Sequence, residues 1–240
     1  MTQPLKNKIA IIFGSTGGLG GAIARKYIDN GAHIISVGRD LKKLEKLDDY
    51  AMSKDTSTTI VQIDVTDLTK LQNLAQEIKN RFGRIDILVS TIGAIGEVSP
   101  LAHYDDKVWD KIIDLNLNAN WKILRSMHPL LIESQNAVAL FATGDMSKTH
   151  KAYWGAYAVS KAALKEMVAI YSEESNVRIN LVDPEPSYTN FRAKAFPGKT
   201  EEDLKKPSEV SEIFVTIAIR SNIISGNTIS YELITSESDA

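Results

Sequence analysis

Cysteine is absent from this chain of 240 residues, so it can form neither a disulfide framework nor a thiolate metal site. The four histidines, His33, His103, His128 and His150, are scattered and form no HExxH pair. We therefore expect no metal site. The sequence also lacks an excess of charge of either sign. Its net charge of −2 gives no basic footprint for a nucleic acid, so we expect no nucleic-acid partner.

Long apolar runs are missing too. No run approaches the ~20 residues that a membrane-spanning helix needs, and residues Met1–Lys8 lack the apolar stretch of a signal peptide. We therefore expect a cytoplasmic protein with no membrane contact. The length suits one domain, 1–240, with a large core, although two smaller domains would also fit it.

Short apolar runs, which predict buried strands, alternate along the chain with amphipathic stretches, which predict helices. The predicted strands are Ile9–Phe13, His33–Val37, Thr58–Ile63, Ile85–Ser90, Ala137–Ala142, Val177–Val182 and Thr228–Tyr231. The predicted helices are Leu19–Asn30, Leu41–Met52, Leu68–Phe82, Asp105–Met127, Trp154–Glu174 and Pro207–Arg220. Asp67 is expected to cap a helix, and Gly31 and Gly83 to end one in the left-handed conformation. The alternation predicts an α/β fold, with a doubly wound, mostly parallel, Rossmann-like sheet of about seven strands and helices on both faces.

The least regular stretch is 183–207, which holds four of the seven prolines. It follows the carboxyl end of a predicted strand, where α/β proteins place their ligand sites. We interpret it as a substrate loop, with an ordinary surface connection as the alternative. Four aromatic residues can line an apolar pocket near it or can simply pack: Trp154, Tyr188, Phe191 and Phe196.

A glycine-rich segment, Gly14-Ser15-Thr16-Gly17-Gly18-Leu19-Gly20, follows the first predicted strand and opens the first helix. Glycine lets the backbone approach a ligand, and a helix N-terminus offers unpaired N–H groups and a partial positive charge. The spacing is G-x-x-x-G-x-G rather than G-x-G-x-x-G. Its strand–turn–helix context predicts a dinucleotide pyrophosphate site, and the alternative is a tight turn without a ligand. The residues assigned to it are Gly14, Ser15, Gly18, Leu19 and Gly20.

Two further strand ends bear on the choice of dinucleotide. No carboxylate ends the second strand, and Arg39 follows it, which suits a 2′-phosphate and favours NADP over NAD. Arg39 can instead be a solvated charge, and Asp40 can cap the next helix or weaken the phosphate preference. After the third strand, Asp64 can accept the adenine amino proton while Val65 lines the adenine slot. A helix-capping role for Asp64 is the equal alternative.

Tyr157 and Lys161 lie four residues apart on a predicted helix and so share one face. A nearby ammonium is expected to lower the pKa of Tyr157, which would make it a general acid for carbonyl reduction and a base for alcohol oxidation. Lys161 can also hydrogen-bond the cofactor's ribose. Tyr50 and Lys54 have the same spacing on a helix that we expect to be peripheral. Position along the chain therefore distinguishes the two pairs.

With these motifs in this order, the chain resembles the short-chain dehydrogenase/reductase family over nearly its whole length. The matching segments are Gly14–Gly20, Asp64, Trp109–Leu117 with Asn116, Tyr157–Lys161, Asn180–Pro184 with Thr189, and Ser225–Asn227. The resemblance implies an NADP-dependent oxidoreductase acting on a small carbonyl or alcohol substrate. Tyr157 would donate the proton, Lys161 would bind ribose and lower the tyrosine pKa, and Asn116 would hold a relay water unless it is an ordinary helix residue. Three further residues would border the cofactor: Gly93, Pro184 and Thr189.

The same resemblance implies that the helices at Asp105–Met127 and Trp154–Glu174 pair across a twofold axis, giving a homodimer or homotetramer. Several positions depart from the family pattern. The threonine before the first glycine is Phe13, the Asn-Asn-Ala-Gly segment reads Ser90-Thr91-Ile92-Gly93, and the Pro-Gly pair is Pro184-Glu185. The hydrogen bonds of the Ser90–Gly93 segment must therefore differ from those of the family.

The family's catalytic serine, thirteen residues before the tyrosine, falls on Gly144. Thr143 can supply an equivalent hydroxyl, or it can merely bond the local backbone. Ser147 is a weaker substitute, since it would need a larger rearrangement. A second hypothesis follows: the chain is a catalytically weak or inactive relative that binds the cofactor as a sensor or scaffold.

Overall fold

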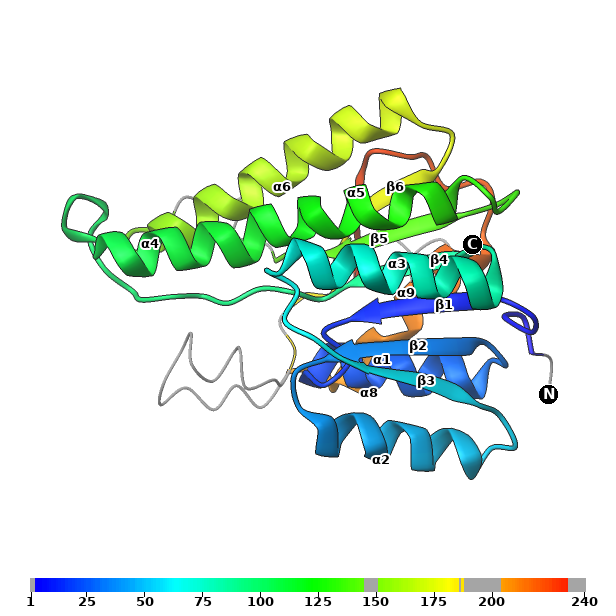
Figure 1. Ribbon diagram of the computed structural model, residues 1–240. Coiled ribbons are helices and arrows are strands. Elements are labelled where there is room, and N and C mark those ends of the chain that lie inside the picture. Colours follow the sequence, from blue (N-terminus) through cyan, green and yellow to red (C-terminus); the bar gives the residue numbers. More distant parts are fainter. Residues whose placement is uncertain (1–2, 145–150, 186, 188–203, 233–240) are drawn as a thin grey trace.

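The computed structural model describes residues 3–144, 151–185, 187 and 204–232. A seven-stranded sheet in the order β3-β2-β1-β4-β5-β6-β7 forms its centre (Figure 1). All neighbouring strands are parallel. The chain builds outward from β1 to β3 and then crosses back to place β4 on the other side of β1. This reversal is the predicted doubly wound arrangement.

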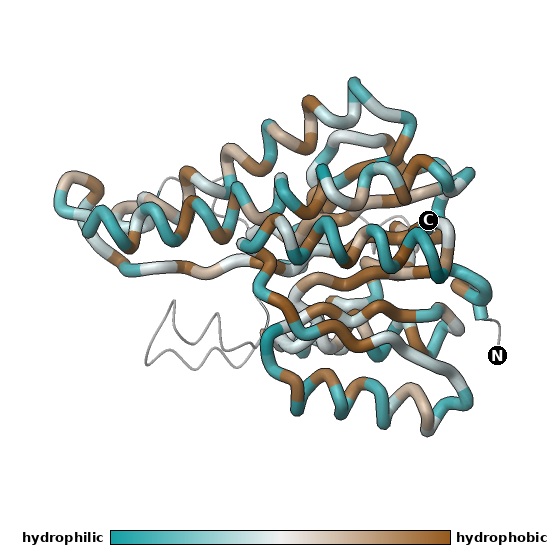
Figure 2. Tube along the Cα trace, viewed as in Figure 1, coloured by the Kyte–Doolittle hydropathy of each residue, from teal (hydrophilic) through white to brown (hydrophobic). Residues whose placement is uncertain are grey.

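The strands follow the predicted apolar runs, and their ends differ from the prediction by at most two residues. They are β1 (Ile9–Phe13), β2 (His33–Gly38), β3 (Thr58–Gln62), β4 (Ile87–Ser90), β5 (Val138–Ala142), β6 (Arg178–Asp183) and β7 (Thr228–Ser230). Brown, apolar stretches run along the central strands in Figure 2, as expected for strands that are covered on both faces.

The helices also follow the prediction, except that two predicted helices are interrupted. They are α1 (Gly18–Asp29), α2 (Leu41–Met52), α3 (Leu68–Phe82), α4 (Asp106–Ile113), α5 (Ala119–Leu131), α6 (Gly155–Glu174), α8 (Pro207–Val210) and α9 (Glu212–Ile219), with a short helical turn at η1 (Leu101–His103). A π-helical turn, η2 (Asp114–Asn118), joins α4 to α5. The predicted end at Met127 is wrong, because α5 continues through Pro129 to Leu131.

The predicted helix ends are confirmed. The Asp67 carboxylate accepts a hydrogen bond from the Lys70 N–H at 3.2 Å at the start of α3. Gly31 and Gly83 follow α1 and α3 with φ of +86° and +76°, where a side chain would be strained. Within the described residues, no helix is long and apolar enough to cross a membrane.

Two apolar cores lie on opposite faces of the sheet. Alternate residues of β1 show the division: Ile11 and Phe13 join one core, and Ala10 and Ile12 join the other. Helices α3, α5 and α6 cover the first core, and α1, α2 and α9 cover the second (Figure 1). The sheet is therefore held from both sides, and the carboxyl ends of its strands are available for a site.

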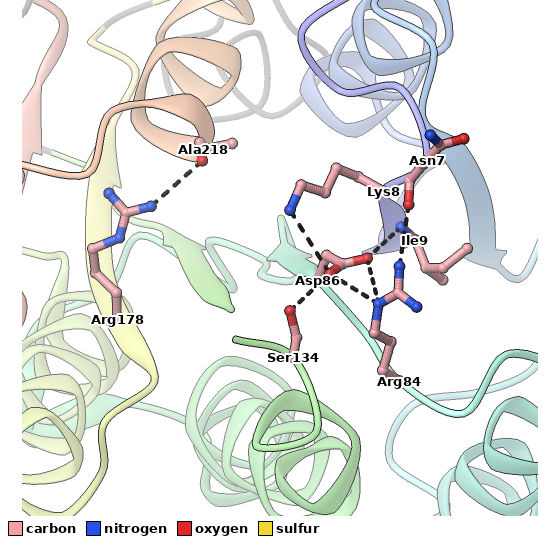
Figure 3. A network of polar contacts seen from close by, with 8 residues as sticks. All are labelled: Asn7, Lys8, Ile9, Arg84, Asp86, Ser134, Arg178 and Ala218. Carbon is pink, nitrogen blue, oxygen red and sulfur yellow. Dashed lines mark hydrogen bonds and ion pairs between the residues drawn. The ribbon is translucent and has the colours of Figure 1, made fainter. Parts of the chain in front are cut away.

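A buried carboxylate joins the two central strands at their amino ends (Figure 3). Asp86 precedes β4 and is only 3% exposed. Its Oδ2 accepts the Ile9 N–H at 2.9 Å, and its Oδ1 accepts the Ser134 hydroxyl at 2.7 Å and the Arg84 Nε–H at 3.2 Å. These bonds fix β4 beside β1 at the end opposite the candidate site.

Candidate active site

The glycine-rich segment forms a tight turn between β1 and α1. Gly14 has a φ of +85°, and a Cβ there would come within 2.6 Å of the Thr91 Oγ1. A Cβ on Gly20 would overlap the carbonyl oxygen of Gly14, so the turn closes only with glycine at both positions. The N-cap, Gly17, provides no side-chain hydrogen bond to the first turn of α1. The N-terminus of α1 is thus shaped for an anion such as a pyrophosphate.

Two hydroxyl side chains hold this turn from either side. The Ser15 hydroxyl donates to the Val37 carbonyl at 3.1 Å, which ties the turn to β2. The Thr91 hydroxyl, just after β4, reaches the carbonyls of Phe13 at 3.1 Å and Gly14 at 3.3 Å. Within the Ser90–Gly93 segment, Thr91 thus bonds the glycine turn, whereas the Ser90 hydroxyl donates to the Asn120 Oδ1 at 2.5 Å. Sequence reasoning missed this role of Thr91, because nothing in a single chain links positions that are 78 residues apart.

Arg39 and Asp64 lie near each other at the ends of β2 and β3. Arg39 is exposed, and Asp40 caps α2 by accepting the Lys43 N–H at 3.2 Å. Asp64 Oδ1 accepts both the N–H and the hydroxyl of Thr66, and these bonds lower the Asp64 pKa, with a smaller contribution from Arg39. The helix-capping alternative for Asp64 is wrong, since Asp67 caps α3. Asp64 remains ionised and exposed beside the buried Val65.

Asn116 lies in the π-helical turn η2 and is completely buried. Its side-chain amide exchanges two bonds with the backbone of Ala94, at 2.8 and 2.9 Å, and donates to the Ser160 hydroxyl at 3.0 Å. Ser160 in turn donates to the Tyr157 carbonyl at 2.8 Å. Asn116 therefore joins the segment after β4 to α6, which excludes the alternative of an ordinary helix residue. The water-relay role stays a prediction.

Helix α6 brings Tyr157 and Lys161 to the carboxyl ends of β4 and β5. Both side chains are buried, and the Lys161 Nζ lies 5.9 Å from the Tyr157 ring centroid. The Lys161 ammonium donates to the Ala142 carbonyl at the end of β5 at 3.0 Å. A Cβ on Gly93 would lie 3.4 Å from both Lys161 Nζ and Asn116 Oδ1. The predicted Tyr157, Lys161, Asn116 and Gly93 therefore lie together.

The protonation of this pair differs from the sequence expectation. Burial raises the pKa of Tyr157, and the negative charge of Asp183 raises it further. Burial also lowers the pKa of Lys161 to about 8. The expectation that Lys161 lowers the Tyr157 pKa is wrong for this arrangement, because removal of the phenolate from water outweighs the nearby ammonium. Tyr157 is therefore protonated at neutral pH and available as a proton donor.

Thr143 and Gly144 follow β5 directly, and Gly144 lies beside the Tyr157 hydroxyl. A Cβ on Gly144 would lie 2.9 Å from the Tyr157 hydroxyl oxygen, so a serine there would need the tyrosine to shift. Thr143 is buried, its backbone N–H donates to the Val182 carbonyl at 2.9 Å, and its hydroxyl has no hydrogen-bond partner among the described residues. The alternative that this hydroxyl bonds the local backbone is therefore wrong. A buried unpaired hydroxyl is costly, which is typical of a site that a ligand completes.

Asp183, at the end of β6, is a site residue that sequence reasoning missed. It is buried, and its Oδ1 accepts the Glu185 N–H at 3.0 Å. Glu185 has a φ of +58°, a left-handed conformation that is uncommon for residues other than glycine. Its carboxylate binds the Lys205 ammonium at 2.7 Å and the Glu232 N–H at 3.0 Å. The unexpected charge is therefore engaged with the C-terminal segment.

Four predictions fall wholly or partly outside the described residues. Ser147 and Thr189 are not among them, and neither is most of the predicted substrate loop 183–207. Three of the four aromatic residues named for a pocket are outside them too: Tyr188, Phe191 and Phe196. Pro184 is described and follows Asp183 at the end of β6. In the second Tyr–Lys pair, Tyr50 is on α2 and Lys54 follows it; the Tyr50 hydroxyl donates to Asp29 at 2.8 Å, and Lys54 lies 3.7 Å from the same carboxylate. This pair is peripheral, as predicted.

Comparisons with known proteins agree with this arrangement. A model of the short chain dehydrogenase family matches residues 8–200. Oxidoreductase YciK of Escherichia coli K12, itself uncharacterised, is 28% identical over 217 residues, which are 88% of this chain and 86% of that protein. The NAD-dependent glycerol dehydrogenase of Listeria innocua serovar 6a is 26% identical over 206 residues, which are 84% of this chain and 79% of that protein.

A solved structure extends the likeness to three dimensions. A short-chain dehydrogenase of Shigella flexneri 2a, crystallised with NADP, is 26% identical and has a TM-score of 0.92, covering 97% of this chain and 100% of that chain. The sheet order, the glycine turn and the family match lead to one assignment. This chain belongs to the short-chain dehydrogenase family and is an oxidoreductase of that type.

Proposed function

We propose that the protein is an NADP-dependent oxidoreductase that transfers hydride between the nicotinamide and a carbonyl or alcohol substrate. The observation that carries the proposal is the placement of the buried, protonated Tyr157 and the Lys161 ammonium at the carboxyl end of β5. Thr143 follows this strand end, and its buried hydroxyl has no hydrogen-bond partner among the described residues. A proton donor is what a carbonyl oxygen requires as it gains charge, and the Thr143 hydroxyl would supply a hydrogen bond to that oxygen.

The described residues fit a dinucleotide. Gly14, Ser15, Gly18, Leu19 and Gly20 would hold the pyrophosphate at the N-terminus of α1. Asp64 and Val65 would receive the adenine, and Gly93 and Lys161 lie where the nicotinamide ribose would bind. Pro184 and Thr189 would border the nicotinamide.

The choice of NADP rests on Arg39. The relatives differ, since the Shigella protein was crystallised with NADP and the Listeria protein is NAD-dependent. Arg39 is exposed at the end of β2, where its guanidinium can bind a 2′-phosphate. Asp40, which can oppose that phosphate, is engaged as the cap of α2. We therefore favour NADP over NAD.

The protein's own groups account for the proton transfer. NADPH, when bound, supplies the hydride to the carbonyl carbon. Tyr157 Oη donates its proton to the carbonyl oxygen, giving the alcohol, and takes that proton back when the alcohol is oxidised. The Thr143 hydroxyl donates a hydrogen bond that orients the same oxygen. The Lys161 ammonium lies next to the phenol and would hydrogen-bond the cofactor's ribose.

Substitutions at Thr143 and Tyr157 test this proposal. We expect Thr143→Val, which removes only the hydroxyl, to lower kcat/KM for carbonyl reduction by about 10²–10³. Thr143→Ser should keep most of the activity. Tyr157→Phe should lose about 10²–10⁴ while NADPH binding, measured by fluorescence titration, stays near that of the wild type. Full activity of Thr143→Val would remove Thr143 from the mechanism.

A second candidate function is favoured by one observation, the absence of a serine at Gly144 and of the space to place one. The chain would then bind NADP as a sensor or scaffold without turnover. In that case Tyr157→Phe would leave every measurable property intact, and wild-type protein with NADPH would reduce no carbonyl compound.

We further propose that residues 1–240 act as one domain, with 183–207 as its substrate loop, and that two copies pair through α5 and α6. Support for pairing comes from the outer surface of these helices. Trp121 on α5 and Val159 and Ile170 on α6 are each about half exposed. Apolar side chains along neighbouring helices are typical of an interface between copies.

A further inference from the structure

A third apolar cluster lies apart from the two sheet cores and includes the proton donor itself. Ile95, Trp154 and Tyr157 form it, and all three are buried. The Trp154 and Tyr157 rings meet edge to face, with centroids 5.9 Å apart. Ile95 belongs to the segment after β4, and Trp154 immediately precedes α6. One side of the reacting hydroxyl is thus covered by apolar atoms from two separate segments.

These two segments are held against each other beyond the cluster. Ser99 pairs with Trp154 in an isolated parallel bridge, and the Ser99 N–H donates to the Tyr153 carbonyl at 3.1 Å. Leu101 lies over the start of α6, so that a Cβ on Gly155 would come within 2.6 Å of its Cδ1. The pairing places the side chains around Ser99 next to those around Trp154.

The outer part of this surface is apolar and exposed. Val98, Leu101 and Tyr153 are each more than half exposed. Tyr153 has a φ of +73°, a left-handed conformation that costs a non-glycine residue free energy and that clusters at ligand-binding positions. We define the apolar wall as Ile95, Val98, Leu101, Tyr153 and Trp154. It runs from solvent to the Tyr157 ring.

We propose that the apolar wall selects carbonyl substrates that carry an aryl or alkyl group on one side of the carbonyl, over hydroxylated ones. The inference rests on the proposed function, since it concerns the substrate of the same site. When a ring or alkyl chain packs against the wall, its apolar surface and that of Leu101 and Trp154 are removed from water. This burial is favourable in proportion to the apolar area involved. A polyhydroxy substrate would lose water at its hydroxyls, and the charged group that lies against the wall is the Lys151 ammonium, 5.9 Å from the Trp154 ring centroid.

One of the similar proteins is a glycerol dehydrogenase, and dihydroxyacetone is the ketone that corresponds to glycerol. The proposal predicts that this protein prefers a different class of ketone. We would measure kcat/KM with NADPH for three ketones: acetophenone, acetone and dihydroxyacetone. Acetone carries neither a ring nor a hydroxyl and serves as the reference. Acetophenone should exceed dihydroxyacetone by at least about tenfold, the usual scale for discrimination by an apolar pocket.

Variants show whether the wall causes the preference. Leu101→Ser should lower kcat/KM for acetophenone by about threefold or more relative to kcat/KM for acetone. Leu41→Ser is the matched control, because Leu41 is also an exposed leucine but lies on α2. Trp154→Phe, which keeps an aromatic ring in the cluster, provides a second variant with the same expected direction.

The outcomes separate this inference from the proposed function. The wild-type protein could reduce all three ketones without preferring acetophenone, or the preference for acetophenone could persist in both wall variants. In either case the wall does not select the substrate, and the proposed function stands. If the wild-type protein reduces no ketone while binding NADPH, both proposals are overturned. A preference for dihydroxyacetone would place the substrate among polyols.

Discussion

At the scale of one residue, the burial of the Lys161 ammonium in the candidate site lowers the stability of the fold. The ammonium is buried and donates a hydrogen bond to the Ala142 carbonyl at 3.0 Å. Burial lowers its pKa to about 8, well below the ordinary value of 10.5. An apolar residue would pack at this position at lower cost, but it would not place a charge next to Tyr157.

We expect a Lys161→Met variant to differ from the wild type in the pH dependence of stability. Between pH 8 and 10.5 the unfolded wild-type chain binds a proton at Lys161 that the folded chain has released. Wild-type stability relative to the variant should therefore rise over this interval, by on the order of 3 kcal/mol. Urea unfolding at several pH values would measure the change.

The matched control for this measurement is Lys54→Met. Lys54 ends the peripheral Tyr–Lys pair after α2 and is exposed. Its removal should leave the shape of the stability profile between pH 8 and 10.5 unchanged. A profile for Lys161→Met that runs parallel to that of the wild type would show that Lys161 is not the buried titrating group.

At the scale of secondary-structure elements, Asp86 joins β4 to β1 and to the segment after α5 (Figure 3). Burial raises the Asp86 pKa, but the bonds from Ile9, Ser134 and Arg84 outweigh it, so that the pKa lies below its ordinary value. We expect Asp86→Asn to lower the free energy of unfolding at pH 7 by about 1–3 kcal/mol, since one or more buried bonds are lost.

The sign of the pH effect follows from the lowered pKa. The ionised carboxylate contributes its full stabilisation above its unfolded pKa of about 3.9 and loses it as the pH falls through the folded value. The gap between wild type and Asp86→Asn should therefore close at acidic pH, as measured by urea unfolding. Asp49→Asn, at an exposed position on α2, is the control. A gap that does not narrow at all as the pH falls from 7 into the acidic range would mean that packing, and not charge, accounts for the loss.

Local patterns were enough to predict the elements but not the contacts between them. Strands such as β1 and β5 are short apolar runs, and their buried faces leave little choice of structure. The interruption of the helix at η2 goes with the hydrogen bonds of Asn116 to Ala94 and Ser160, and both partners are distant in sequence. The pKa of Tyr157 depends on burial and on Asp183, neither of which follows from the spacing to Lys161. Glu185 in the left-handed conformation breaks a residue preference, so sequence could not predict its ion pair with Lys205.

At the scale of the whole molecule, α5 and α6 carry apolar side chains on the surface away from the sheet. Val159 and Ile170 are exposed on α6, and Trp121 is exposed on α5 with Arg125 5.3 Å from its ring centroid. The inner side of α6 packs against the protein's own core, since Leu164 and Val168 belong to the core shared with α3 and α5. The outer surface is therefore open to a partner, and the proposed dimer would cover it.

We expect a Val159→Lys/Ile170→Lys double variant to dissociate this dimer, because the α6 helix of each copy would bury two charges without partners at the interface. Light scattering coupled to size-exclusion chromatography should give a dimer or tetramer mass for wild type and a monomer mass for the variant. A Leu41→Lys/Met52→Lys variant introduces the same charges at exposed apolar positions of α2 and should keep the wild-type mass.

Val159 is two residues from Tyr157, so dissociation should also lower kcat/KM while circular dichroism stays unchanged. A wild-type monomer, or a double variant that keeps the oligomeric mass, would place the interface elsewhere or remove it.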